Sequence, residues 1–154
     1  MTFDYINFEV DPSPTNPIGI VRRPELVLRV RGDRSDEYVM ALVDTGADEC
    51  VLPLSLADSL GVAVDPSKSI RAAGVGGQLI ELLPGLVELE IADGSESYCW
   101  HAVVGFARFE SPEHESTCLG HVGALEFFTA TFDGGAHRLT LVPNVTFPGQ
   151  TSSS

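Results

Sequence analysis

Residues 41–53 decide the fold, and they read Ala41-Leu42-Val43-Asp44-Thr45-Gly46-Ala47-Asp48-Glu49-Cys50-Val51-Leu52-Pro53. The apolar, β-prone run before Asp44 predicts a strand that is buried on both faces and ends at this carboxylate. An ionisable side chain at the end of such a strand is unusual, because a lone buried carboxylate is costly. Gly46 permits a tight turn and a close approach of the backbone to a ligand, and the Thr45 hydroxyl can brace that turn.

The segment Ala-Leu-Val-Asp-Thr-Gly-Ala-Asp resembles the active-site loop of the retropepsin-like aspartic proteases, the family that contains the retroviral proteases. An Asp-Thr-Gly triplet alone is a weak signal, since turns often hold these residues, but the flanking apolar strands make the match specific. The resemblance implies that Asp44 is catalytic and that Thr45 and Gly46 support the loop, with the Thr45 hydroxyl joining the two loops of a dimer. It also implies that Ala47 and Asp48 contact the substrate.

A glycine-rich segment and a second motif follow in the family's order. The segment Gly74-Val75-Gly76-Gly77 lies between two strand-like runs and by itself is typical of a flexible hairpin tip. In the retropepsins, a hairpin of this kind forms the flap over an extended substrate, so these four residues are expected to bind substrate.

The motif Leu119-Gly120-His121 resembles the family's second conserved block, which packs under the catalytic loop and leads into the single helix. The family usually carries an arginine where this chain has His121, and that arginine pairs with the aspartate equivalent to Asp48. A histidine can still donate to a carboxylate, more strongly when protonated. We therefore expect a pH-dependent support of Asp48 by His121.

The periodicity of the remaining chain predicts an all-β fold, a small closed β-barrel of retropepsin type with one or two short helices. Pro53, leucines spaced by four and Gly61 predict a helix over 53–60. Pro84-Gly85 predicts a break or bulge in its strand. Hairpins are expected at 25–43, 86–106 and 129–142, where alternating apolar residues flank turn-forming residues.

Three regions follow from these patterns. Residues 1–24 are a proline-rich N-terminal extension with a candidate interface strand at 3–10, and residues 25–147 form the protease domain. Residues 148–154, rich in threonine and serine, are expected to be a disordered tail. The acidic stretch 110–117 is expected to be an exposed loop.

Composition narrows the partners and the compartment. The 154 residues carry a formal net charge of -13, which disfavours nucleic acid and anionic lipid as partners. No apolar run is long enough for a membrane span, and the start of the chain does not resemble a signal peptide. The three cysteines, odd in number and widely spaced, indicate a reducing compartment, and we expect the cytoplasm. No metal-ligand spacing occurs, so no metal and no cofactor are expected.

Hydrolysis of a peptide bond by carboxylates requires two of them close enough to share a proton. The chain contains a single Asp-Thr-Gly, and Asp93-Gly94-Ser95 and Asp133-Gly134-Gly135 are typical of hairpin turns. The second aspartate must then come from another copy across a two-fold axis. The sequence therefore predicts an endopeptidase that is active as a homodimer on peptide or protein substrates. The alternative is a non-catalytic dimerisation or peptide-binding module on the same fold.

Overall fold

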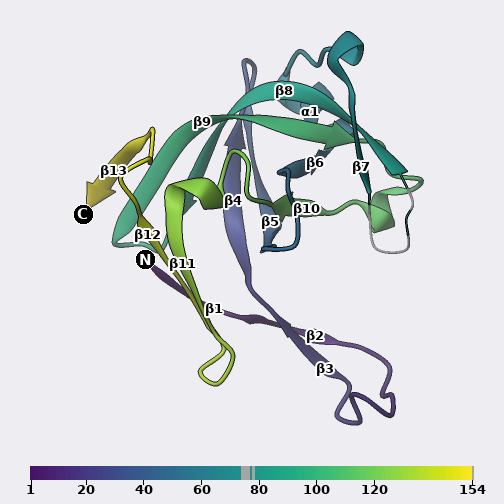
Figure 1. The fold of residues 1–154 in the computed structure, drawn as a ribbon, viewed down its shortest axis with the longest axis vertical. Helices are drawn as coiled ribbons and strands as arrows, with labels where there is room; N and C mark the ends of the chain where they lie inside the picture. Colours follow the sequence, from purple (N-terminus) through teal and green to yellow (C-terminus); the bar gives the residue numbers. More distant parts are fainter. Residues whose placement is uncertain (74–76, 78, 154) are drawn as a thin grey trace.

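The computed structural model describes residues 1–73, 77 and 79–153 (Figure 1). Its strands are β1 (Thr2–Asp4), β2 (Ile6–Glu9), β3 (Ile20–Arg23), β4 (Glu25–Arg31), β5 (Asp36–Val43), β6 (Val51–Pro53), β7 (Ile70–Ala73), β8 (Leu79–Ala92), β9 (Glu96–Ala107), β10 (Thr117–Leu119), β11 (Phe128–Asp133), β12 (Arg138–Pro143) and β13 (Gln150–Ser153). The α-helix α1 spans Leu54–Leu60, and short 3-10 turns span Pro66–Lys68, Pro112–His114 and Leu125–Phe127.

Six of these strands close into a barrel, in the order β9-β6-β10-β5-β4-β8 with β8 pairing back onto β9. The contacts of β10 with β5 and of β6 with β9 are parallel, whereas β4, β5, β8 and β9 form long antiparallel hairpins. A separate three-stranded sheet, β1-β12-β11, lies beside the barrel, and β2 and β3 form a two-stranded ribbon. The prediction of an all-β fold with a small closed barrel is confirmed.

The β4–β5 hairpin brings Asp44 to its place. Leu26, Leu28 and Val30 alternate along β4 and are buried, as the period of two predicts. On β5, Ala41 and Val43 are buried in the same core, and Asp44 follows directly. The chain therefore leaves the core at the residue where the sequence places the carboxylate. The prediction that this strand is buried on both faces is wrong, because Tyr38 and Met40 on its other face are exposed.

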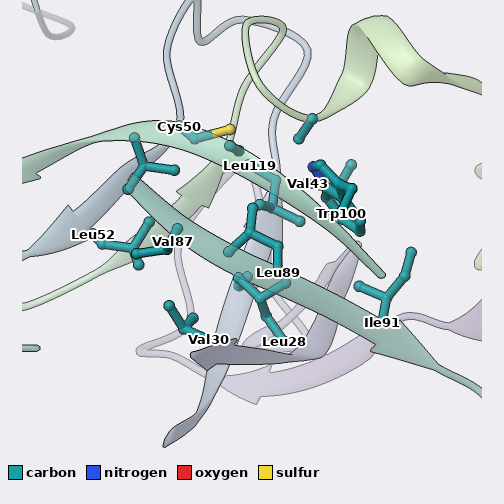
Figure 2. Close-up of a cluster of buried hydrophobic side chains, with 14 of the residues drawn as sticks. Leu28, Val30, Val43, Cys50, Leu52, Val87, Leu89, Ile91, Trp100 and Leu119 are labelled. Atoms are coloured by element: carbon teal, nitrogen blue, oxygen red, sulfur yellow. The ribbon is translucent and has the colours of Figure 1, made fainter. Parts of the chain in front are cut away.

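The barrel is filled by aliphatic side chains from every long strand, packed around the single tryptophan. Figure 2 shows Val43 and Leu119, which flank the Asp44 loop, in one cluster with Leu89 and Trp100. The indole Nε1–H of Trp100 donates to the Gly123 carbonyl at 2.8 Å, so the buried ring has its polar atom satisfied. Burial of each large aliphatic side chain contributes roughly 1.5–3 kcal/mol, which makes this cluster the main stabilising element.

Helix α1 begins one residue later than predicted and ends as predicted. Pro53 is its N-cap, with an extended backbone, and Gly61 is its C-cap in the left-handed conformation at φ 75. The Gly61 N–H bonds to the Asp58 carbonyl and the Val62 N–H to the Ala57 carbonyl, which closes the helix end. The helix thus turns the chain away from the floor of the Asp44 loop.

Other expectations about the fold also differ from the structure. The break predicted at Pro84-Gly85 is wrong, because β8 runs through both residues and pairs with β9 in an unbroken register. Pro84 is tolerated because β7 pairs with β8 only as far as Leu82 and β4 pairs with it only from Glu88, so no ladder bond is needed from the Pro84 nitrogen.

The segment after Gly120, where the resemblance implies a helix, instead forms turns and the 3-10 segment Leu125–Phe127, because Gly123 takes φ 84 and interrupts a helical path. The tail expected to be disordered contains β13, which pairs antiparallel with β9 from Gln150 to Ser153. Its order comes from backbone pairing with an exposed strand edge, which polar residues can also form.

Candidate active site

The backbone of Asp44 is held by strands on both sides. The Val43 N–H donates to the Pro24 carbonyl at 2.9 Å, and the Asp44 N–H donates to the Leu119 carbonyl at 3.1 Å. Because β10 runs parallel to β5, with Leu119 opposite Val43, the second motif lies directly beside the first. The position of Asp44 is therefore fixed by the sheet rather than by the turn alone.

Within the turn, Asp44 organises the residues that follow it. Its Oδ1 accepts the Gly46 N–H at 2.8 Å, and its main-chain carbonyl accepts the Ala47 N–H at 3.2 Å. A Cβ on Gly46 would lie 3.2 Å from Asp44 Oδ1, closer than most Cβ contacts. Glycine at this position therefore avoids a close contact with the carboxylate. Asp44 is half-buried and Thr45 is exposed, and Oδ2 has no hydrogen-bond donor among the described residues. That oxygen is available to a water molecule or to a second carboxyl group.

Gly120 lies immediately beneath the loop. A Cβ at this position would be 2.7 Å from the Ala47 carbonyl and in collision with the Glu49 backbone, so only glycine fits. The His121 N–H donates to the Ala47 carbonyl at 3.0 Å and the Val122 N–H to the Asp48 carbonyl at 2.8 Å. The buried Leu119 completes this support, in the arrangement that the resemblance implies for the second block.

A cleft of about 380 Å³ opens over Asp44. One wall is the loop itself, and the other comes from strands β7 and the start of β8, with the lining residues Asp44, Gly46, Ala47, Asp48, Glu49, Val51, Ile70, Arg71, Ala72, Ala73 and Ile80. Strands β7 and β8 pair up to Ala73 and Leu79 and form the wall of the cleft that faces the Asp44 loop. Gly77 has φ 79, a conformation that favours glycine, whereas Gly74, Val75 and Gly76 lie outside the described residues.

The comparison with known families agrees with this geometry. Residues 28–97 match the aspartyl protease family. The matched segment contains the Asp44 loop, helix α1 and the strands β7 and β8 of the cleft wall, and it ends before the Leu119-Gly120-His121 block. The resemblance to the retropepsin-like aspartic proteases is thereby confirmed. Curated proteins give no match to this chain. Among the described residues, no helix has the length and apolar character needed to cross a membrane.

In this candidate site, His121 has a different partner from the one predicted. Its Nε2 lies 3.1 Å from the Thr45 carbonyl, an acceptor, so Nε2–H is the donor. His121 does not contact the Asp48 carboxylate, because its side chain points toward the Thr45 carbonyl. A neutral imidazole with its proton on Nε2 suffices for this contact, so His121 can brace the Asp44 turn without being charged.

The structure also places Cys118, which the sequence analysis did not single out, on the strand next to the one that leads to Asp44. Cys118 lies opposite Leu42 on the parallel strand pair β10–β5. Burial, and then the negative charge of Asp44, raise the pKa of the Cys118 thiol to about 11. The side chain is therefore a neutral thiol beside the carboxylate. The signal in the sequence was its place directly before Leu119 in the block under the loop.

Other cysteines take no part in the site. All three are free. Cys50 is buried under the loop, with Sγ 3.2 Å from the Val122 carbonyl, and burial raises its pKa to about 12. A buried thiol with a raised pKa is a poor nucleophile. A larger hollow of about 610 Å³, lined by Leu54, Leu83, Phe106, Arg108 and His114 among others, lies beyond β8 and does not include Asp44.

Proposed function

We propose that this chain is an aspartic endopeptidase that is active as a homodimer, with one Asp44 from each copy activating a water molecule. The observation that carries the proposal is the placement of Asp44, which lines the cleft while its Oδ1 accepts the Gly46 N–H. One carboxylate of the pair would deprotonate the water and the other would protonate the carbonyl oxygen of the scissile bond.

The shape of the cleft supports an extended peptide as substrate. Its walls are apolar at Ala47, Val51, Ile70 and Ile80, and the edge strand β7 offers backbone groups to a chain lying beneath it. Main-chain hydrogen bonds of this kind bind an extended segment with little regard to sequence, and the side-chain pockets then select. Asp48 and Glu49 add negative charge at one side of the cleft.

Only one Asp-Thr-Gly is present in the chain, so the reaction requires a second copy. Two carboxyl groups about 3 Å apart cannot both ionise, so the two aspartates would share one proton. The two apparent pKa values would then describe the pair of aspartates and not either residue alone. Thr45, which is exposed next to Asp44, would contact the loop of the second copy.

The test is cleavage of a mixed peptide library, followed by mass spectrometry, from about pH 4 to 7, where a shared-proton pair is half-ionised. The wild type, Asp44→Asn and the matched control Asp133→Asn are compared at equal concentration, and light scattering gives their oligomeric state. We expect the wild type and the control to cut the same peptides and Asp44→Asn to cut none. Binding without cleavage by a dimeric wild type would instead indicate the non-catalytic module, and cleavage by a monomer would exclude the shared pair.

A further inference from the structure

The ribbon formed by β2 and β3 stands apart from the rest of the protein. The two strands pair with each other from Ile6–Arg23 to Glu9–Ile20, and with no other strand among the described residues. Figure 1 shows the ribbon extending away from the barrel below β4 and β5. Its first end is anchored, because the Tyr5 N–H donates to the His137 carbonyl at 2.8 Å and the two rings meet edge to face.

One face of this ribbon is apolar. The pairing register places Ile6, Phe8 and Val21 on the same side, and Val10 continues the alternation. Ile6 is 38% exposed and Val10 is 39% exposed. In the described chain, none of these four side chains belongs to the set that packs against the barrel core. The Arg23 guanidinium covers part of the face, at 4.7 Å from the centre of the Phe8 ring.

A two-stranded ribbon with an uncovered apolar face is only marginally stable in water. The face would be stabilised by a surface that removes it from solvent, as apolar patches on soluble proteins generally mark contact sites. The ribbon is therefore expected to have a partner surface.

The ribbon begins where a second copy has to be. Its last strand leads through Pro24, whose carbonyl accepts the Val43 N–H at 2.9 Å, so the ribbon leaves the barrel one residue from Asp44. The shared pair of aspartates brings another copy to the same place. A stable interface between two proteins buries about 1,000 Å² or more, so contacts in addition to those of the Asp44 loops are expected.

Charge also favours a contact through the ribbon. Two copies that each carry a formal net charge of -13 repel one another. Within the ribbon, Glu9 and Asp11 are balanced by Arg22 and Arg23. A neutral segment with an apolar face adds no like-charge repulsion to the interface.

We propose that the β2–β3 ribbon is a dimerisation arm that reaches across the two-fold axis and packs its apolar face on the second copy of this chain. The inference rests on the proposed function, which supplies the axis near Asp44. By symmetry each copy gives one arm and receives the other, so the contact is made twice.

The receiving surface is the exposed apolar patch on the outer face of β4 and β5, formed by Val27, Tyr38 and Met40. Val27 and Met40 are opposite each other in the hairpin, and Met40 precedes Asp44 by four residues along the chain. At about 3.3 Å per residue, Met40 at the near edge of the patch lies roughly 13 Å from Asp44, and the segment from Arg23 back to Ile18 spans about 17 Å when extended. The arm of one copy is long enough to reach the patch of the other.

The first experiment measures the dissociation constant of the dimer by sedimentation velocity. Ile6→Asp and Val10→Asp place charge on the apolar face of the arm, and Val145→Asp, at a fully exposed valine elsewhere, is the matched control. We expect each arm variant to raise the dissociation constant about tenfold or more, with the control unchanged. Equal dissociation constants for all four proteins would overturn the arm.

Cleavage by the same proteins separates this proposal from the proposed function. At concentrations above the raised dissociation constant, the arm variants should recover the wild-type turnover per dimer, because none of the substituted residues lines the cleft. Arm variants that dimerise and cleave as the wild type does would contradict the dimerisation arm and agree with the proposed function. A wild type that cleaves as a monomer would contradict the proposed function, in which the two aspartates come from two copies.

The second experiment locates the contact. A photoreactive phenylalanine analogue in place of Ile18, at the exposed tip of the ribbon, is irradiated in a mixture of isotope-labelled and unlabelled protein. We expect cross-links between labelled and unlabelled peptides that join residue 18 to the segment containing Tyr38 and Met40. Cross-links confined to one isotope, or to another surface, would contradict the assignment.

Discussion

Asp44 and Asp133 begin turns with the same local geometry and have different surroundings. In each turn Oδ1 accepts the N–H two residues on, at 2.8 Å from Gly46 and at 2.9 Å from Gly135. Asp133 is exposed at the tip of the β11–β12 hairpin, and its Oδ1 also accepts the Ala136 N–H at 2.7 Å. Asp44 is half-buried, with β10 beside it and a cleft above it.

The difference shows that an aspartate-capped turn of this kind recurs in the molecule, and that the strand and the cleft next to Asp44 distinguish its turn from the others. Asp93 repeats the device in the β8–β9 hairpin, where its Oδ1 accepts from the Ser95 N–H, the Ser95 hydroxyl and the Glu96 N–H. Asp93 and Asp133 thus use their acceptor capacity to hold a turn. Asp44 uses one oxygen for the turn, and its other oxygen has no hydrogen-bond donor among the described residues.

The largest effect should come from removing each carboxylate in turn. Asp44→Ala should lower kcat/KM about a hundredfold or more, because an acid–base group is lost, and should change stability little. Asp133→Ala should keep full activity and lower the free energy of unfolding by about 1 kcal/mol, because two N–H groups lose their acceptor. Peptide cleavage and urea denaturation measure the two quantities. Loss of activity in Asp133→Ala would break the comparison.

Glycines near the two turns give a smaller contrast. Gly120→Ala should lower the free energy of unfolding by about 1–3 kcal/mol, because its Cβ would meet the backbone under the Asp44 loop. Gly134→Ala is the matched control, since within the described residues nothing lies close to its Cβ. Thermal unfolding of both variants, with cleavage assays on the folded fraction, tests the contrast. Equal stabilities would mean that the loop can move away from β10.

The smallest effect concerns pH at a turn that holds no catalytic group. Hydrogen bonds from the backbone of Ser95 and Glu96, with the Ser95 hydroxyl, lower the pKa of Asp93 from 3.8 to about 2. A lowered pKa stabilises the fold above the unfolded value, and this contribution is lost as the pH falls through the folded value. Asp93→Asn keeps an acceptor without the charge.

We therefore expect the difference in Tm between the wild type and Asp93→Asn to be constant between about pH 5 and 7 and to shrink between about pH 4 and 2. Differential scanning calorimetry at a series of pH values measures it. A difference that stays constant down to about pH 2 would show that the charge of Asp93 adds nothing to the turn.

Much of this fold is visible in the sequence because its long hairpins alternate strictly. Leu26, Leu28 and Val30 predict their own burial, and the apolar run that ends at Asp44 predicts the place of the carboxylate. Helix α1 follows from leucine spacing and from Gly61. These are local signals, carried by residues within one element.

The features that sequence reasoning missed depend on neighbours distant in the chain. Pro84 continues a strand because β7 and β4 both leave its nitrogen without a partner. The polar tail forms β13 because β9 has an edge free to pair. His121 meets Thr45 and Cys118 lies beside Asp44 because β10 runs parallel to β5, a pairing that no local pattern encodes.

The single tryptophan gives the molecule a built-in optical reporter. Trp100 is 2% exposed and packs edge to face against Phe128 and Phe147, so its emission reports on one environment only. Its indole N–H is bonded to Gly123, three residues after the glycine that supports the Asp44 loop. Displacement of that supporting segment would change the polarity at the indole, and a red shift in fluorescence would record it without any label.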